Sequence, residues 1–315
     1  MGLIKKSNEI AIQKNVKMMV YGQAGVGKTT LALSSPKPLL LDFDNGVKRV
    51  NNAHLAEVGI VQINSWQEVM TLLTTEAADL APFETIVVDT IGKMLDFIIA
   101  YRCGGRNPKV QDWGIINSDF KWFVNSLSSL NKHIIFVAHR DTRKEGDDTV
   151  FVPALREKSY NSIVTELDLL GYLEMKNENG VQKRSITFDP TSRNDGKNTC
   201  QLDGVMFLQN IIDKNSMPTG DNDFIQKRII AKYQDMIAIK EKAKEEYNRV
   251  LAEIKESIDT MTDAKGANHF LEHIGDYKGM GNSVILYARE IFAKKVKSLG
   301  LTYNKETKLY EDAAA

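Results

Sequence analysis

Near its beginning the chain carries Gly22-Gln23-Ala24-Gly25-Val26-Gly27-Lys28-Thr29-Thr30, which contains a complete GxxxxGK[ST] motif. The motif directly follows the apolar run Lys17–Tyr21 and precedes a segment of helical character. Three glycines let the backbone wrap around phosphates with its N–H groups pointing inward, at the positive end of a helix dipole. Lys28 then supplies charge to the β- and γ-phosphates, and the Thr29 hydroxyl is a ligand for Mg²⁺. The stretch predicts a strand, a loop that binds ATP with Mg²⁺, and a helix.

Around this motif, short apolar runs alternate with longer amphipathic stretches, which is typical of a mostly parallel sheet flanked by helices, an α/β fold. Runs such as Ile86–Val88 are unbroken, as expected of strands buried on both faces. We predict strands at Lys17–Tyr21, Leu39–Leu41, Ile60–Ile63, Thr85–Val88 and His133–Ala138, and a terminal hairpin of Leu169–Met175 and Ser185–Phe188. We predict helices after Lys28, around Trp66–Leu73 and Ile91–Tyr101, and from about Ile115 to Leu130.

Polar residues end several of these predicted strands. Asp89 closes the strand Thr85–Val88, where it is expected to hold Mg²⁺ together with Thr29. Asp42 and Asp44 follow the predicted strand Leu39–Leu41 and project on the same side, so one can act as general base and the other as a support or a turn former. His139 ends the strand His133–Ala138 and would lie beside the γ-phosphate if the strands are neighbours.

Composition narrows the class of protein. The 315 residues contain 43% hydrophobic and 26% charged residues, which fits an ordinary soluble protein. Lys+Arg and Asp+Glu both number 41, so any binding of a polyanion must come from a local patch. The two cysteines, Cys103 and Cys200, have no CxxC pairing, and no apolar run is long enough to span a membrane. We expect a cytoplasmic protein without a membrane, disulfide or zinc framework.

The last third of the chain has a different character. We predict an ATPase core at 1–212, a Pro, Gly, Asn and Asp-rich linker at 213–223, and a helical hairpin or small bundle at 224–315. No strand signal is visible after Phe224. One long helix carries the apolar seam Ile229, Tyr233, Met236, Ala243, Tyr247, Val250 and Ile254, and a second carries Ile285, Ala288, Phe292, Val296 and Leu299. The seam is consistent with packing on the protein's own core or with a subunit contact.

The order of these pieces resembles the RecA-like P-loop ATPase core over about residues 15–205. The resemblance implies that Asp44 is the catalytic base, that Asp89-Thr90 ends the metal-site strand, and that His139 senses the γ-phosphate. It further implies that Lys197-Asn198 reaches the γ-phosphate of a neighbouring subunit in a homo-oligomer. Thr199 stands where RecA has a second lysine, so Arg193 is an alternative trans-acting residue. The short core also resembles the Sak type of phage-encoded single-strand-annealing proteins, and so implies a phage-infected or prophage-bearing host.

Two basic segments are candidates for contact with single-stranded DNA. One follows His139, where a contact would depend on the state of the nucleotide, and offers Arg140, Arg143 and Lys144. The other, Tyr101–Lys109, combines a glycine pair with Arg102, Arg106 and Lys109 and has aromatic residues nearby. Either segment could instead be a solvated polar loop.

The leading hypothesis is therefore a DNA-stimulated, Mg²⁺-dependent ATPase of phage recombination or annealing, with a phage or host single-strand-binding protein as a further partner. A nucleotide-dependent protein switch or assembly factor without DNA, and a helicase-like motor, are the alternatives. A nucleotide kinase is disfavoured because no Arg-rich lid insertion is visible.

Overall fold

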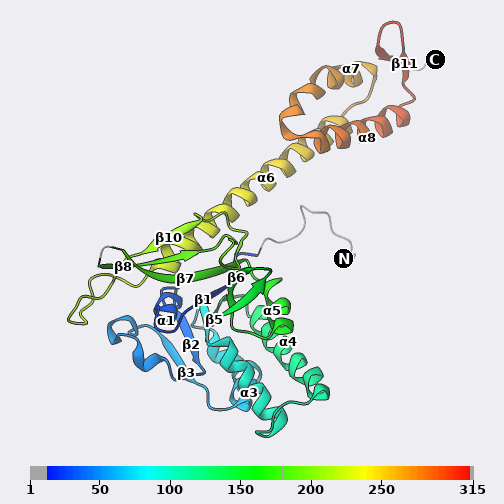
Figure 1. Cartoon of the computed structure of the whole chain (residues 1–315). Helices are drawn as coiled ribbons and strands as arrows, with labels where there is room; N and C mark the ends of the chain where they lie inside the picture. Colours follow the sequence, from blue (N-terminus) through cyan, green and yellow to red (C-terminus); the bar gives the residue numbers. More distant parts are fainter. Residues whose placement is uncertain (1–12, 179, 313–315) are drawn as a thin grey trace. The chain divides into compact units, whose positions relative to one another are not determined.

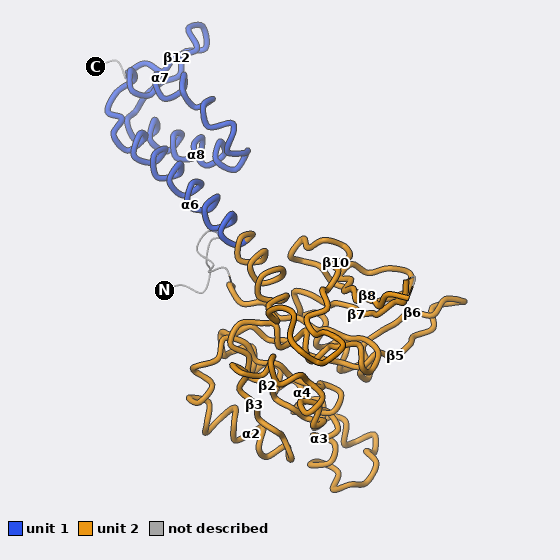
Figure 2. Tube along the Cα trace, turned by 90° about the vertical axis from the view of Figure 1, so that its left-hand side faces the viewer, with its two compact units in different colours: residues 1–12, 237–315 blue, residues 13–236 orange. Residues whose placement is uncertain are grey.

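The computed structural model describes residues 13–178 and 180–312 (Figure 1). Contacts divide them into two compact units, residues 13–236 and residues 237–312 (Figure 2). The larger unit thus includes residues 213–236, which the sequence analysis assigned to the linker and to the C-terminal helices. In the described part of the chain, no helix combines the length and the apolarity that crossing a membrane requires.

The larger unit is built on a ten-stranded sheet with the order β10-β8-β7-β1-β5-β4-β2-β3. In addition, β6 pairs with β5 and β9 pairs with β7. Strands β3, β2, β4, β5, β1 and β7 are parallel to one another, and β8, β10, β6 and β9 pair antiparallel with their neighbours. The strands are β1 (Lys17–Gly22), β2 (Pro38–Asp42), β3 (Gly59–Gln62), β4 (Thr85–Asp89), β5 (His133–Glu145), β6 (Asp148–Pro153), β7 (Leu169–Glu178), β8 (Val181–Thr187), β9 (Lys197–Asn198) and β10 (Val205–Leu208).

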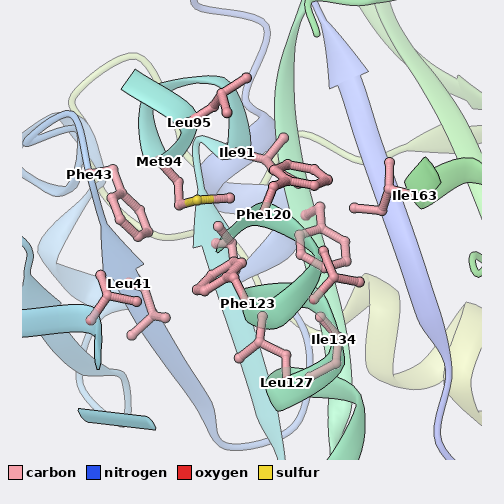
Figure 3. Packing of buried hydrophobic residues seen from close by; sticks show 14 of the residues in the cluster. Leu41, Phe43, Ile91, Met94, Leu95, Phe120, Phe123, Leu127, Ile134 and Ile163 are labelled. Atoms are coloured by element: carbon pink, nitrogen blue, oxygen red, sulfur yellow. The ribbon is translucent and has the colours of Figure 1, made fainter. Parts of the chain in front are cut away.

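Helices cover this sheet and enclose its main core. The α-helices of the larger unit are α1 (Lys28–Ala32), α2 (Trp66–Thr74), α3 (Ile91–Cys103), α4 (Trp113–Ser129) and α5 (Glu157–Val164), with 3-10 turns at Val47–Arg49, Asn52–His54, Ala77–Leu80 and Val110–Asp112. Alternate strand residues such as Leu41 and Ile134 pack against Met94 of α3 and Phe120 and Phe123 of α4 (Figure 3). The strand residues between them are buried as well, because both faces of a parallel sheet are covered. The predicted fold class, a mostly parallel sheet flanked by helices with a helical C-terminal extension, is confirmed.

Of the two basic segments expected to be loops, the first is a strand, and the second is a loop only from Gly104 to Lys109. The segment Arg140–Gly146 was expected to be a loop, but β5 continues to Glu145 and pairs with β6 as a hairpin (Figure 1). Its base is fixed, because the Tyr21 hydroxyl of β1 lies 2.9 and 2.7 Å from the carbonyl oxygens of Phe151 and Asp195, which share its single O–H donor. In the other segment, Arg102 lies on α3, which ends at Cys103. The extension of β5 is polar and charged, and the apolar run Val150–Val152 of β6 is only three residues long, so neither was predicted as a strand.

Residues after β10 return to the first helix. A π-helical turn, Ile225–Ile230, follows Phe224 and leads into α6 (Ala231–Asp259). The backbone N–H groups of Ile225 and Gln226 donate to the hydroxyl and the carbonyl oxygen of Ser34. The Asn222 side-chain amide donates to the carbonyl oxygen of Thr30 at 2.8 Å. These bonds satisfy acceptors just past the end of α1, so the segment 222–226 is held against the helix that follows the P-loop.

The smaller unit holds most of α6, α7 (Ala264–His273), a 3-10 turn (Ile274–Met280), α8 (Asn282–Ser298) and a two-stranded sheet of β11 (Thr302–Asn304) and β12 (Leu309–Glu311). The expectation of no strand after Phe224 is therefore wrong, since β11 and β12 are too short to give a periodic signal. Ile254, Phe270 and Phe292 are central to the core. The buried face of α8 begins at Val284 rather than at Ile285.

Candidate nucleotide-binding site

Strand register brings the predicted site residues to one edge of the sheet. Gly22 at the end of β1 is paired with His139 on β5, and Asp42 at the end of β2 is paired with Asp89 on β4. Because β5 lies between β1 and β4, His139 belongs to the strand that separates the P-loop from Asp89. The carboxyl ends of parallel strands are where α/β sheets bind ligands.

The loop from Gly22 to Lys28 has the backbone of a phosphate cradle. Gly25 and Gly27 adopt positive φ angles of 77° and 98°, which side chains rarely tolerate. A Cβ at Gly22 would lie 2.2 Å from the carbonyl oxygen of Leu173, so only glycine fits there. The Lys28 ammonium donates to the carbonyl oxygens of Gly22 and Gln23 at 3.0 and 2.9 Å. Burial lowers the pKa of Lys28, while Asp89 and Asp44 oppose the shift.

Thr29 and Asp89 form the candidate metal pair. The Thr29 hydroxyl donates a 2.5 Å hydrogen bond to Oδ2 of Asp89. Burial, chiefly, raises the pKa of Asp89 to about 6, with the charges of Asp44 and Asp42 acting in the same direction. A hydroxyl and carboxylates converging at one edge form the all-oxygen donor set that Mg²⁺ prefers. A bound divalent cation would also supply the positive charge that these clustered carboxylates lack.

Asp42 and Asp44 play different parts. Asp42 is 1% exposed and accepts hydrogen bonds from the backbone N–H groups of Gly46 and Val47, so it holds the turn after β2. Oδ1 of Asp44 is buried and has no hydrogen-bond partner among the described residues; Arg49 is 3.9 Å away. A carboxylate oxygen that is buried and unsatisfied, near Lys28 and Asp89, is available to a water molecule. Asp44 is therefore the better candidate for the general base.

The surroundings of His139 favour its neutral form, because they lower the pKa of the imidazole. Partial burial lowers its pKa, with Lys28 acting in the same direction and Asp44 opposing. The carbonyl oxygen of His139 accepts a 2.7 Å hydrogen bond from the N–H of Ala154, just after β6. A neutral imidazole at this edge can donate one N–H to a γ-phosphate oxygen without adding a full charge.

A cavity of about 290 Å³ opens on one side of the P-loop. Gly27 and Thr30 form its floor, and residues 207–212 and 221–228 form its walls, with Phe207 and Phe224 among them. Arg184 of β8 also lines it, and its Nε donates to the carbonyl oxygen of Val26 at 3.2 Å. Sequence analysis missed Arg184, since nothing in the hairpin sequence indicates that β8 passes beside the P-loop.

A second cavity, of about 360 Å³, lies against residues 23–26 on the other side of the loop. Three cationic residues line it: Arg140, Lys176 and Arg193. Glu174 lies 2.7 Å from Lys176 and 3.9 Å from Arg193, so it offsets part of their charge. The Arg140 guanidinium lies 4.3 Å from the centroid of the Phe151 ring and has no carboxylate partner within the described residues. We refer to this cavity as the basic cavity.

The two trans-acting candidates occupy different places. Lys197 pairs with Leu170 near the start of β7, away from the P-loop edge, and its ammonium donates to the carbonyl oxygens of Val164 and Thr165 at the end of α5. Arg193 lines the basic cavity beside the P-loop of its own chain. Lys197 thus binds carbonyl oxygens at the C-terminus of α5, whereas Arg193 lies at the edge of the sheet that carries the P-loop.

The remaining DNA candidates are mostly engaged. Arg102 makes two hydrogen bonds with Asp119, and Arg106 makes two with Asp112. Arg143 is bound to Asp195 and Glu145, which raise its pKa. The other two are less restrained: Lys144 donates to the Thr149 hydroxyl on the hairpin, and the backbone N–H of Lys109 is bound to Asp112.

The fold and this edge define a P-loop ATPase of RecA-like fold, since the sheet carries a GxxxxGK[ST] loop after β1, Asp89 at the end of β4 and Asp44 just after β2. The chain belongs to the AAA domain family, whose profile matches residues 14–200. The match ends before β10 and the segment 222–226, so both walls of the 290 Å³ cavity lie outside the family domain.

Comparison with individual proteins finds distant relatives. The chain is 25% identical over 176 residues to the SPbeta prophage-derived uncharacterized protein YorG of Bacillus subtilis (strain 168), spanning 52% of this chain and about half (51%) of that relative. Among solved structures, it is similar to the KaiC-like protein PH0186 of Pyrococcus horikoshii OT3 (TM-score 0.35, 12% identity, 55% of this chain and 77% of that one). It is also similar to the flagellar accessory protein FlaH of Methanocaldococcus jannaschii (TM-score 0.36, 12% identity, 62% and 90%).

Proposed function

We propose that the protein is an ATP- and Mg²⁺-dependent, single-stranded-DNA-binding ATPase of phage recombination or annealing. The observation that carries this proposal is the basic cavity, which shares residues 23–26 with the phosphate-binding loop. A strand of DNA held there lies against the nucleotide site itself. The prophage origin of YorG supports a phage context for this protein.

In this proposal the triphosphate of the nucleotide binds to residues 22–29, and its nucleoside occupies the 290 Å³ cavity. Thr30 lies at the junction, because it follows the metal ligand Thr29 and lines that cavity. Phe207, which is 67% exposed at the wall, offers a ring face on which a base can stack. Mg²⁺ held by Thr29 and Asp89 would neutralise charge on the phosphates.

Hydrolysis follows from the residues around the γ-phosphate position. Asp44 orients a water molecule through its unsatisfied Oδ1 and accepts a proton from it. Lys28 leaves the carbonyl oxygens of Gly22 and Gln23 and binds phosphate oxygens. His139 donates a hydrogen bond to the same group from the neighbouring strand.

The state of the nucleotide reaches DNA through β5. Arg140 directly follows His139 and lines the basic cavity. A shift of His139 toward a phosphate therefore also displaces Arg140, which contacts DNA in this proposal. The hairpin beyond it is braced by Tyr21 of the P-loop strand. DNA affinity can therefore differ between the ATP and ADP states, as coupling requires.

The experiment that tests the proposal measures binding of a fluorescent single-stranded oligonucleotide by anisotropy, with a non-hydrolysable ATP analogue or ADP, together with ATPase rates with and without DNA. We expect tighter binding with the analogue, a faster ATPase with DNA, and a log–log salt slope of about −0.7 per neutralised phosphate. The double variant Arg140→Ala/Arg193→Ala should weaken binding and make the slope shallower by about 1 to 2.

Arg106→Ala is the matched control, because Arg106 is exposed but already paired with Asp112. It should leave DNA affinity nearly unchanged. ATP turnover that ignores DNA, with no salt-dependent binding in either nucleotide state, would overturn the DNA proposal and favour the protein switch or assembly factor. Strand separation driven by ATP would favour the helicase-like motor.

A further inference from the structure

The smaller unit carries a cluster of metal-binding side chains that the ATPase does not use. His269, Glu272 and His273 lie on α7, at positions i, i+3 and i+4, so all three project from one face of the helix. One ligand atom from each side chain lies within 4.8 Å of the others. The two imidazole rings are 4.7 Å apart between centroids, with a nearly perpendicular orientation of 65°.

A fourth residue orients one of these ligands. Oδ2 of Asp276 lies 3.1 Å from Nδ1 of His273. This is the usual outer-shell arrangement of a metal-binding histidine, in which a carboxylate accepts the Nδ1 proton and Nε2 remains available for the cation. Asp276 comes from the turn Ile274–Met280 rather than from α7, so two consecutive elements contribute to the cluster.

Charge around the cluster also favours a cation. His273 is the last residue of α7, where the unsatisfied carbonyl groups give the helix end a partial negative charge. Glu272 and Asp276 add carboxylates at the same place. The cluster is exposed, with 56% of the His273 side chain accessible, so a cation can enter without any rearrangement of the core.

We propose that His269, Glu272 and His273 form a binding site for a late first-row divalent cation, with Zn²⁺ as the physiological occupant. Two imidazoles and a carboxylate are the donors that zinc accepts, and three protein ligands leave the fourth tetrahedral position to water. Tetrahedral zinc needs ligand atoms about 3.4 Å apart, a distance that surface side chains reach by small rotations. Asp276 is a positioning residue.

The test measures Zn²⁺ affinity of the full-length protein by competition with a chromophoric chelator. His269→Gln and His273→Gln should each weaken the tightest site at least tenfold, and the double variant should remove it. Asp276→Asn should weaken it less than either, because the ligands remain. His54→Gln is the control, since His54 lies in the larger unit, and it should change nothing.

Two further readouts separate a true site from background binding. Co²⁺ should give the visible absorption of tetrahedral coordination in the wild type and not in the double variant. Zn²⁺ should slow hydrogen exchange in α7 and the turn Ile274–Met280 of the wild type alone. Equal zinc affinity and stoichiometry in the wild type and the double variant would overturn the proposal, whatever the ATPase assays show.

Discussion

The hydroxyl of Thr29 donates a 2.5 Å hydrogen bond to Asp89, across 60 positions of sequence. Without a cation, this bond joins the two groups that hold Mg²⁺ in our proposal. A cation has to replace it, so the two residues are already positioned at the metal site. Five predictions follow from this edge of the sheet and from the core beneath it.

Thr29→Val should remove a metal ligand while keeping the shape of the side chain. We expect nucleotide affinity in the presence of Mg²⁺ to fall roughly 10- to 100-fold. Affinity in EDTA should change little, because the phosphate contacts of the loop and Lys28 remain. Titration with a fluorescent ATP analogue measures both. Thr30→Val is the matched control and should retain the Mg²⁺ effect; a Thr29 variant that also retains it would contradict the assignment.

Asp44→Asn should lower kcat roughly 10²- to 10⁴-fold with little change in nucleotide affinity, since a general base is lost. Asp42→Asn should instead destabilise the larger unit by about 1–3 kcal/mol, because the amide keeps an oxygen for one backbone N–H group but turns its NH2 donor toward the other, which is left buried without an acceptor. Steady-state ATPase rates and urea unfolding distinguish the two. Exchanged phenotypes would transfer the catalytic role to Asp42.

Phe207→Ala should weaken ATP binding about tenfold if a base stacks on this ring. The affinity of the variant for inorganic tripolyphosphate should be unchanged, because tripolyphosphate occupies the loop but not the cavity. Val205→Ala is the matched control: Val205 is also exposed on β10 but does not line the cavity. Equal losses for ATP and tripolyphosphate would place the nucleoside elsewhere.

Arg193 can act on its own nucleotide or on that of a neighbouring subunit, and a mixing experiment decides between them. Arg193→Ala and Lys28→Ala should each be inactive alone, the second because it cannot bind the phosphates. If Arg193 acts in trans within a homo-oligomer, mixed variants should regain part of the ATPase activity. Lys197→Ala, mixed in the same way, is the comparison. Failure of mixtures to recover activity, with subunits exchanging, would assign Arg193 to its own P-loop.

Stability of the larger unit should depend on pH through His133. This side chain is 5% exposed, its Nδ1 accepts a hydrogen bond from the N–H of Val16, and burial lowers its pKa. Below the unfolded value of 6.5 the unfolded chain takes up a proton that the folded chain resists. Stability due to His133 is therefore intact above pH 6.5 and lost as pH falls, by up to about 1.4 kcal/mol per pH unit.

Urea unfolding between pH 8 and 5.5 measures this slope, and tryptophan fluorescence reports the larger unit because Trp66, Trp113 and Trp122 all lie in it. His133→Gln should flatten the slope. His54→Gln, which changes a histidine of the 3-10 turn Asn52–His54, is the control. A slope that survives His133→Gln would assign the effect to another group.

The parallel strands could be predicted because burial on both faces forces an unbroken apolar run, as at Ile86–Val88. The strands that were not predicted are only partly buried, as β6 is, or very short, as β11 is, so burial imposes no long apolar run on them. The segment Arg140–Glu145 was not predicted as a strand because it is polar, yet backbone pairing with β6 makes it one.

Sequence alone determined the chemistry of the P-loop, since Gly22–Thr29 is contiguous and its phosphate contacts are made by backbone and neighbouring side chains. Asp89 was also predictable, because a parallel strand delivers its last residue to the same edge. The family resemblance pointed to Asp44 rather than Asp42 as the base, but only the tertiary structure gives a physical reason, since it buries Asp42 under two N–H donors and leaves Asp44 with an unsatisfied oxygen. Tertiary contacts likewise placed Arg184 and residues 207–212, 221–224, 227 and 228 around one cavity, because positions far apart in the chain meet only after the sheet has formed.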